Sequence, residues 1–415
     1  MTDVKELGKK AKQAKYLVSA LSTEEKNEAL RKIAADLIEN STDILNANAQ
    51  DIRQAREHGM HEGLVDRLLL NQERLQAISE GLCQIAALPD PVGRILEEKT
   101  LDNGLHITKV SVPLGVIGII YESRPNVTAD AFGLCFKSGN AVILKGGSDA
   151  LLSNIAITDC IRRSLKECQI TEDAISIIPV ADREVTQELI RCKEYVDVLI
   201  PRGGAGLIKN VVENSLVPVI ETGTGNCHIY IDEFASLDKA LPIIVNAKTQ
   251  RIGVCNACES LVIHEKHVKD FLPVIAKALH DKNVEIRGDE TVCANVDNCI
   301  LATQEDYAKE YLDLIISVKT VKSLSEAINH INENSTGHSE AIITENEEHA
   351  KRFQKEIDSA CVYVNASTRF TDGFEFGLGA EIGISTQKLH ARGPMGLQEL
   401  TTYKYTITGN GQIRK

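Results

Sequence analysis

Short apolar runs and helical stretches alternate along this chain from about residue 113, and this alternation limits the folds it can adopt. The apolar runs are rich in Val and Ile, as expected for strands buried on both faces. They lie at 116–120, 141–144, 175–180, 196–200 and 217–220. Stretches with helical spacing, for example 149–167 and 183–193, fall between them. The order predicts an α/β fold in which helices cover a parallel sheet.

The same alternation begins again after residue 226, with apolar runs at 228–231 and 261–263. A restart of this kind indicates a second domain. We therefore expect three parts, and we place their boundaries at 1–225, 226–366 and 367–415. Residues 3–90 have the spacing of amphipathic helices, and Ser22-Thr23 is a typical helix start.

Two stretches outside these domains have the pattern of exposed strands. Residues 98–113 form two alternating runs around Asp102-Asn103-Gly104, a sequence typical of a β-hairpin. The tail 401–408 alternates in the same way. We expect the tail strand to join the hairpin in a small β arm with a role in oligomer formation.

Composition excludes several classes of partner. The formal net charge of −13 argues against nucleic acid and anionic membranes. The eleven cysteines have no framework spacing, which argues against disulfides and for a reducing compartment. The first residues lack a signal-peptide core, and no apolar run of 18 or more residues predicts a membrane span. We expect a cytoplasmic globular protein.

Cys255 stands in the most informative segment, residues 250–260 (QRIGVCNACES). Small residues and an amide surround this thiol, as a nucleophile with an oxyanion to stabilise would require. A buried structural cysteine is the ordinary alternative. Cys258 completes a CxxC, which also fits a redox dithiol or half of a zinc site. No second matching pair accompanies it, so we expect no metal and assign Cys258 to packing.

Polar residues follow several predicted strands. Glu221 ends one of them before glycine-rich backbone, where it is either a general base or a solvated carboxylate. Arg124 and Asn126 follow the first strand. The Asn126 amide could donate to an oxyanion and the Arg124 guanidinium could bind an anion, although a plain polar turn has the same composition.

Ligands of open α/β sheets bind at the carboxyl ends of the strands. Lys145 and Gly146 end the strand 141–144, so the Lys145 ammonium could reach a ribose or a phosphate. Gly203, Gly204 and Gly206 follow another strand and open a helix, where backbone amides can bind a pyrophosphate. A G-x-G-x-x-G fingerprint is absent, so these glycines alone are a weak signal.

Four longer stretches together resemble the aldehyde dehydrogenase superfamily, most closely its branch that reduces γ-glutamyl phosphate. They are residues 121–128 (YESRPNVT), 221–228 (ETGTGNCH), 250–257 (QRIGVCNA) and 390–397 (HARGPMGL), in the family's order. The resemblance implies two Rossmann-like parallel-sheet domains and a small β oligomerisation arm. Residues 1–225 would bind the cofactor, 226–366 would carry the catalytic thiol, and 367–415 would return to the arm.

The resemblance also implies roles by position. Cys255 falls at the family's catalytic thiol, Glu221 at its glycine-flanked glutamate and Asn126 at its oxyanion donor. Lys145 falls at the lysine that contacts the adenosine ribose, and Glu310 at the glutamate that holds the nicotinamide ribose. Two positions depart from the family's pattern. Ser148 replaces a carboxylate common in NAD-preferring relatives, which favours NADPH by removing repulsion of a 2′-phosphate. The glycine-rich turn at 203–206 replaces a turn that usually contains Ser or Thr.

The implied substrate is L-glutamyl 5-phosphate, reduced by NADPH to glutamate 5-semialdehyde on the route to proline. Candidate substrate contacts are Arg124, Asn256, Thr368, Arg369 and Asp372. The chain contains no kinase segment, so the acyl phosphate would come from a separate glutamate 5-kinase, with which we expect transient contact. We also expect a homo-oligomer. The alternative hypotheses are a family member with another acyl or aldehyde substrate, a CxxC redox or zinc protein, and an inactive scaffold.

Overall fold

The computed structural model describes residues 3–122 and 124–414, which form two compact units. The first unit extends to Glu221 and includes Gly377–Gly383 and the segment from Met395 onward. The second unit comprises Thr222–Phe376 and Ile384–Pro394. The sequence places this boundary after residue 225, whereas the chain passes from one unit to the other between Glu221 and Thr222. Each unit contains its own parallel sheet.

The sheet of the first unit has four strands in the order β5-β4-β3-β6. They are β5 (Ile175–Ile177), β4 (Ala141–Lys145), β3 (Val116–Tyr121) and β6 (Val198–Arg202), and every pairing is parallel. All residues of β3 and β4 are buried, which explains their continuous apolar runs. The predicted strand at 217–220 is wrong, because Val219 forms only an isolated bridge with Leu199.

Helices make up most of the rest of the first unit. The helices before the sheet are α1 (Val4–Ser19), α2 (Thr23–Glu39), α3 (Ser41–Glu57), α4 (Glu62–Leu68) and α5 (Gln72–Ala87). Those between the strands and after them are α6 (Asn126–Lys137), α7 (Leu151–Glu167), α8 (Arg183–Ile190) and α9 (Ala205–Asn214). The predicted start of α2 is confirmed, because Ser22 and Glu25 form a capping box. Helix α8 is shorter than its predicted range, 183–193, because Arg191 forms its C-cap.

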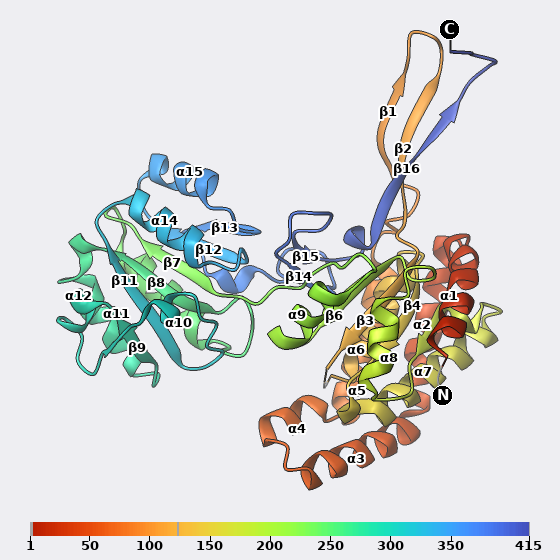
Figure 1. Ribbon diagram of the computed structural model, residues 1–415, viewed down its shortest axis with the longest axis horizontal. Coiled ribbons are helices and arrows are strands. Elements are labelled where there is room, and N and C mark those ends of the chain that lie inside the picture. The colour runs from red at the N-terminus through yellow and green to blue at the C-terminus, as the bar shows by residue number, and fades with distance from the viewer. Residues whose placement is uncertain (1–2, 123, 415) are drawn as a thin grey trace. The chain divides into compact units, whose positions relative to one another are not determined.

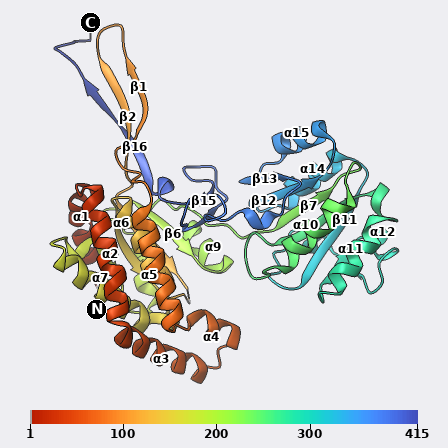
Figure 2. The same ribbon diagram turned by 180° about the vertical axis from the view of Figure 1, so that it is seen from behind.

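The predicted hairpin and tail strand form one antiparallel sheet, β1 (Ile95–Thr100), β2 (His106–Pro113) and β16 (Thr401–Thr408). Residues Thr401 to Thr408 pair with Pro113 to His106, so the last strand lies along the whole of β2. Figures 1 and 2 show the three strands side by side. Tyr405 and Ile407 on β16 are 54% and 61% exposed, which is unusual for apolar side chains in a strand.

The sheet of the second unit has seven strands in the order β10-β9-β11-β8-β7-β12-β13, and all of them are parallel (Figure 1). The strands are β7 (Cys227–Ile231), β8 (Cys258–His264), β9 (Glu285–Gly288), β10 (Ile300–Leu301), β11 (Ile315–Val321), β12 (Ser339–Ile343) and β13 (Cys361–Val364). The helices are α10 (Leu237–Thr249), α11 (Phe271–His280), α12 (Glu290–Cys293), α13 (Gln304–Tyr307), α14 (Leu324–Asn334) and α15 (Glu347–Glu356).

Successive residues of these strands enter two separate cores. Leu261 and Ile263 of β8 pack with residues of α10, α11 and α12, whereas Val262 packs with residues of α14 and α15. Since neighbouring side chains of a strand point to opposite faces, the helices cover both faces of the sheet. The predicted α/β fold with parallel sheets is therefore confirmed.

Short elements complete the chain. They are the strands β14 (Gly383–Ser385) and β15 (Gly393–Met395), which pair, and the 3₁₀ turns η1 (Ser148–Ala150), η2 (Glu172–Ala174), η3 (Glu265–His267), η4 (Thr368–Phe370) and η5 (Gln398–Leu400). Cys293 and Cys299 form a disulfide across the segment between α12 and β10. The sequence argued against disulfides, and this pair is an exception, because the intervening turn brings the two residues to a Cα separation of 5.0 Å. None of the described helices is both long and apolar enough to cross a membrane.

Candidate active site

Cys255 lies in the turn that connects α10 to β8, and it is half-buried. Gly225, just before β7, packs directly on its backbone: a Cβ atom at Gly225 would lie 1.5 Å from the Cys255 carbonyl oxygen. The Cys227 thiol donates a hydrogen bond to the same oxygen at 3.1 Å. The backbone of Cys255 is therefore held by two residues of the segment that begins β7.

Asn256 fixes the other side of the turn. This side chain is 4% exposed, and its Nδ2 donates to the Thr371 carbonyl at 2.9 Å. Its carbonyl oxygen accepts a hydrogen bond from Thr368 Oγ1 at 2.7 Å, and its Oδ1 accepts one from Arg369. The structure thus brings together three predicted substrate residues: Asn256, Thr368 and Arg369. Asp372, a fourth, caps the turn after it by accepting from the backbone of Phe374 at 2.9 Å.

The Arg369 guanidinium has an unusual electrostatic environment. Burial lowers its pKa, and the positive charge of Arg251 lowers it further. Asp372 and a thiolate at Cys255 act in the opposite direction. Nε of Arg369 donates to Gln250 Oε1 at 2.8 Å, which fixes the direction of the guanidinium. Arg369 interacts with the thiol and Arg251 with Arg369, which makes this part of the turn suitable for an anionic group.

Cys258 differs from Cys255 in its surroundings. It lies on β8 with no exposed surface, and its thiol donates to the Ser260 carbonyl at 3.4 Å. Burial raises its pKa to about 12, so it carries its proton at neutral pH. Within residues 3–122 and 124–414, no three His, Cys, Asp or Glu side chains gather as a metal site would require. These surroundings fit the packing role assigned to Cys258.

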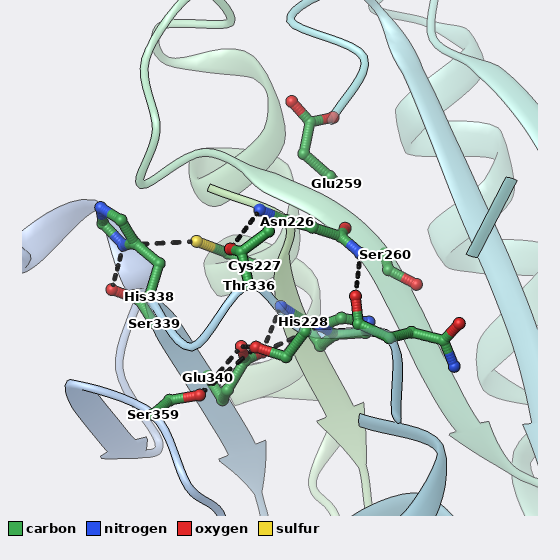
Figure 3. A network of polar contacts seen from close by, with 12 residues as sticks. Asn226, Cys227, His228, Glu259, Ser260, Thr336, His338, Ser339, Glu340 and Ser359 are labelled. Carbon is green, nitrogen blue, oxygen red and sulfur yellow. Dashed lines mark hydrogen bonds and ion pairs between the residues drawn. The ribbon is translucent and has the colours of Figure 1, made fainter. Parts of the chain in front are cut away.

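A buried polar network supports the start of β7 and β12 (Figure 3). Cys227 Sγ lies 3.7 Å from His338 Nδ1, and His338 Nδ1 lies 2.8 Å from the Ser339 hydroxyl. His228 Nδ1 contacts Glu340 Oε2 at 3.0 Å, and Ser359 donates to the same carboxylate. Burial lowers the pKa of His338 to about 4, so this imidazole is neutral at pH 7. Sequence reasoning missed this network, although Cys227 and His228 belong to a family-like stretch.

Glu310 lies in the segment 308–314 between α13 and β11. Its Oε1 accepts a hydrogen bond from the backbone of Gly225 at 2.7 Å. Burial raises the pKa of Glu310, and the Gly225 amide lowers it. The structure therefore places Glu310 next to the glycine that packs on Cys255, within the same unit.

Asn126 is the first residue of α6 in the first unit. Its Nδ2 donates to Asp130 Oδ2, one helical turn later, at 2.9 Å. Burial raises the pKa of Asp130 to about 6, against the effects of Asn126 and of Arg202. Sequence reasoning did not select Asp130, although the spacing of four residues on a helix could have indicated the contact. Arg124 is exposed just before this helix, and its carbonyl accepts a hydrogen bond from Val127 at 3.1 Å.

Lys145 is the last residue of β4, where the sequence places it. Its Nζ donates to the Gly146 carbonyl at 2.9 Å, and burial lowers its pKa. A side chain at Gly146 would lie 2.3 Å from Asn154 Nδ2, a buried donor with no partner among the described residues. Ser148 is exposed, and its hydroxyl contacts the Asp149 carboxylate at 3.1 Å. A negative charge thus remains next to Ser148.

Gly203, Gly204 and Gly206 follow β6 and open α9, also as expected. The carboxylate of Glu122, which follows β3, accepts a hydrogen bond from the Gly204 amide at 2.8 Å. A Cβ atom at Gly203 would lie 2.5 Å from the same carboxylate oxygen. An anionic group therefore already contacts the start of this helix.

Glu221 is half-buried in the extended segment after β6 and α9, next to Thr222, which bridges to Ser385.

Comparisons with known proteins agree with this arrangement. The model of the aldehyde dehydrogenase family matches residues 1–311 and 290–405. The chain is 57% identical over its full length to the gamma-glutamyl phosphate reductase of Lachnospira eligens, which it also covers in full. It is 56% identical to that of Heliobacterium modesticaldum, over 98% of each chain.

Solved structures agree as well. The crystal structure of gamma-glutamyl phosphate reductase from Thermotoga maritima matches with a TM-score of 0.98 and 53% identity over 99% of each chain. An acetylating aldehyde dehydrogenase from Geobacillus thermoglucosidasius matches over 100% of each chain with a TM-score of 0.68 and 16% identity, and so shares the fold. The chain is therefore an oxidoreductase that belongs to the aldehyde dehydrogenase family, in the branch that contains the gamma-glutamyl phosphate reductases.

Proposed function

We propose that this chain reduces L-glutamyl 5-phosphate to L-glutamate 5-semialdehyde with NADPH and releases phosphate, the second step of proline biosynthesis from glutamate. The names of relatives 55–57% identical to it support this activity. The observation that carries the proposal is the fixed position of Cys255 between Gly225, Cys227 and the Asn256 turn. A nucleophile in a rigid turn beside cationic groups suits acyl transfer from an anionic substrate.

The chemistry divides into two steps at Cys255. The thiolate attacks the γ-carbonyl carbon, the C–O bond to phosphate breaks, and a thioester remains on the enzyme. NADPH, when bound, supplies the hydride that reduces this thioester to the aldehyde level. The C–S bond then breaks and the thiolate is restored. Overall, acyl phosphate, NADPH and one proton are converted to aldehyde, phosphate and NADP⁺.

Asn126 and the backbone amide of Cys255 would hold the oxyanion in both steps. The contact with Asp130 orients the Asn126 amide, since only its Nδ2 can donate to a carboxylate. Glu221 has no water to activate in a reductive reaction, so its role as a base in hydrolytic relatives does not transfer directly. We assign it to the catalytic group on the resemblance alone.

The residues of the first unit fit a dinucleotide. Lys145 and the glycines 203, 204 and 206 lie at the carboxyl ends of parallel strands, and the Glu122 carboxylate must leave the Gly204 amide before a phosphate can bind there. These residues would hold the phosphates and adenosine ribose, and Glu310 the nicotinamide ribose. Ser148 favours NADPH over NADH, although the neighbouring Asp149 reduces this preference.

Arg369 and Arg124 would bind the anionic groups of the substrate. Arg369 is oriented by Asn256 and Gln250, next to the thiol, so its guanidinium suits either the phosphate or the α-carboxylate. Thr368 and Asp372 belong to the same turn, where Thr368 supports Asn256.

Steady-state kinetics test the proposal in the reverse direction. We expect NADP⁺ reduction that requires both glutamate 5-semialdehyde and phosphate, with lower activity on NAD⁺. Oxidation of simple aldehydes without phosphate would instead indicate another member of the family. The absence of any thioester on Cys255 by mass spectrometry after substrate trapping would contradict the mechanism.

Two associations complete the proposal. Because acyl phosphates hydrolyse readily, we propose transient contact with a glutamate 5-kinase in the cytoplasm, tested by competition with excess inactive reductase for the intermediate. We also propose a homo-oligomer formed through the β arm. Sedimentation of a variant with Tyr405→Ser and Ile407→Ser tests this, since both side chains are largely exposed in the single chain.

A further inference from the structure

The segment that carries Glu310 has an unusual backbone. Leu312, two residues later, has a φ of 54°, in the left-handed region that residues with a side chain rarely adopt. Its amide donates a hydrogen bond to Glu259 Oε1 at 3.1 Å. Such a conformation persists only where surrounding contacts fix it, and this hydrogen bond is one of those contacts.

Glu259 is held in turn by Lys248. The Glu259 Oε2 and Lys248 Nζ atoms are 2.6 Å apart, and neither side chain has any exposed surface. Glu259 is the second residue of β8, and Lys248 lies in the last turn of α10, so the pair connects the two ends of the turn that carries Cys255. Figure 3 shows Glu259 on β8, close to Asn226 and Cys227 at the start of β7.

Further contacts fix the same segment. Asn226 Nδ2 donates to the carbonyl of Tyr307, just before the segment, at 2.8 Å. Glu310 accepts from Gly225 at 2.7 Å. Residues 307–312 are therefore attached, at Tyr307, Glu310 and Leu312, to residues at the starts of β7 and β8.

Stability alone does not explain a buried Lys–Glu pair. Burial raises the pKa of Glu259, and the Lys248 ammonium opposes this effect most, followed by the hydrogen bond from the Leu312 amide. Apolar side chains of similar volume usually give equal or greater stability at such a position. They would not, however, offer an acceptor to the Leu312 amide. The specific contribution of the pair is thus the hydrogen bond that fixes the segment carrying Glu310.

We propose that Glu259, held by Lys248, is a positioning residue that keeps the Glu310 segment in the conformation that binds the nicotinamide ribose. This inference rests on the proposed function, because that proposal assigns Glu310 to the cofactor. Glu259 itself touches neither the cofactor nor the substrate in this account. Its effect reaches Glu310 through the hydrogen bond to Leu312, and the two carboxylates also repel each other directly.

The test replaces both charges together, with Lys248→Met and Glu259→Leu, so that no unpaired charge remains buried. The matched control is Lys26→Met with Asp90→Leu in the first unit. That pair lies 2.5 Å apart, with Lys26 buried and Asp90 13% exposed, and Asp90 likewise accepts a backbone hydrogen bond, from Val92 at 2.9 Å. Each variant is measured for its melting temperature, its Kd for NADPH by fluorescence, its KM and kcat, and hydrogen exchange of residues 308–314 without ligand.

We expect the Lys248/Glu259 double variant to melt within a few degrees of the parent. Its Kd and KM for NADPH should rise about tenfold, as expected when one charge-assisted hydrogen bond is lost, with kcat within about twofold. Exchange in 308–314 should quicken by a similar factor. The control should change none of these cofactor or exchange values. A purely structural role predicts that the double variant also keeps the parental Kd, and that result would overturn the proposal.

A third variant, Glu310→Ala, separates this inference from the proposed function. If the parent shows no phosphate-dependent activity but binds NADPH, the proposed reaction is wrong while the Kd values still decide the role of Glu259. If Glu310→Ala leaves the Kd for NADPH unchanged, Glu310 is not a cofactor contact and the positioning role is refuted with it. If Glu310→Ala and the double variant weaken NADPH binding to a similar extent, the inference stands.

Discussion

Gly225→Ala should disable the enzyme by moving Cys255. The new Cβ would lie 1.5 Å from the Cys255 carbonyl oxygen, 2.3 Å from its carbonyl carbon and 2.7 Å from its Cα. Contacts under 3.0 Å essentially do not occur for real Cβ atoms. Because the obstacle is backbone and not a flexible side chain, one of the two segments must move by at least the missing 1.5 Å. The same glycine donates to Glu310, so the segment proposed to hold the nicotinamide ribose shifts as well.

A displacement of about 1 Å at a reacting group can reduce the rate by about 100-fold. We therefore expect kcat/KM for semialdehyde oxidation to fall at least 100-fold, which corresponds to about 2.7 kcal/mol of transition-state stabilisation. Gly81→Ala, in the middle of α5, is the control: its Cβ would meet Asp130 at an ordinary 3.9 Å, so activity should persist and stability should rise by about 0.5–1 kcal/mol. A folded Gly225→Ala enzyme with kcat/KM within threefold of the parent would refute the assigned role of this contact.

Four further outcomes follow from the site. Cys255→Ala should abolish turnover, whereas Cys258→Ala should keep it and lower the free energy of unfolding by about 1–2 kcal/mol, measured in urea. Asp130→Asn tests a pH effect. Burial raises the pKa of Asp130 in the folded state to about 6, above an unfolded value of about 3.9. Ionisation of this carboxyl therefore lowers the stability of the parent as pH rises from about 4 to 6. The variant should thus melt higher than the parent above pH 6 and lose this advantage near pH 4, and a pH-independent difference would contradict the assignment. Ser148→Asp should lower kcat/KM with NADPH about tenfold and change it little with NADH, and equal losses would count against a 2′-phosphate contact. Arg369→Gln should slow alkylation of Cys255 by iodoacetamide about tenfold at pH 7, because a nearby cation favours the thiolate, and an unchanged rate would remove Arg369 from this role.

The first unit was the more predictable part of the chain. Strands β3 and β4 are short, apolar and buried on both faces, so their apolar runs locate them, whereas the apolar run at 217–220 forms no strand. Lys145 and Gly203 were selected as candidates from a general rule, that ligands lie beyond the carboxyl ends of parallel strands. The rule cannot show that Glu122 would contact the Gly204 amide, because this contact joins residues that follow two different strands.

The second unit shows where sequence reasoning ends. Cys255 was selected as the candidate nucleophile from its small polar neighbours and from the resemblance. Its supports, Gly225, Cys227 and His338, come from distant segments that only the sheet brings together. The Cys293–Cys299 disulfide was missed for a similar reason, since a spacing of six residues matches no framework and the closing turn is visible only in three dimensions.

The location of the thiol gives these supports a physical reason. In the second unit, Cys255, Gly225 and His338 lie just before strands, at the amino ends of β8, β7 and β12 respectively. In the first unit, Lys145 and Gly203 lie at the carboxyl ends of strands. An amino end of a parallel sheet is approached by the carboxyl ends of helices, here α10, whose partial negative charge disfavours a thiolate. Nearby positive charge from Arg369 opposes this effect. At this edge, stabilisation of a thiolate therefore depends on nearby arginine and on the hydrogen-bonded backbone beside Gly225. A site at the carboxyl end of the sheet would instead use the amino terminus of a helix.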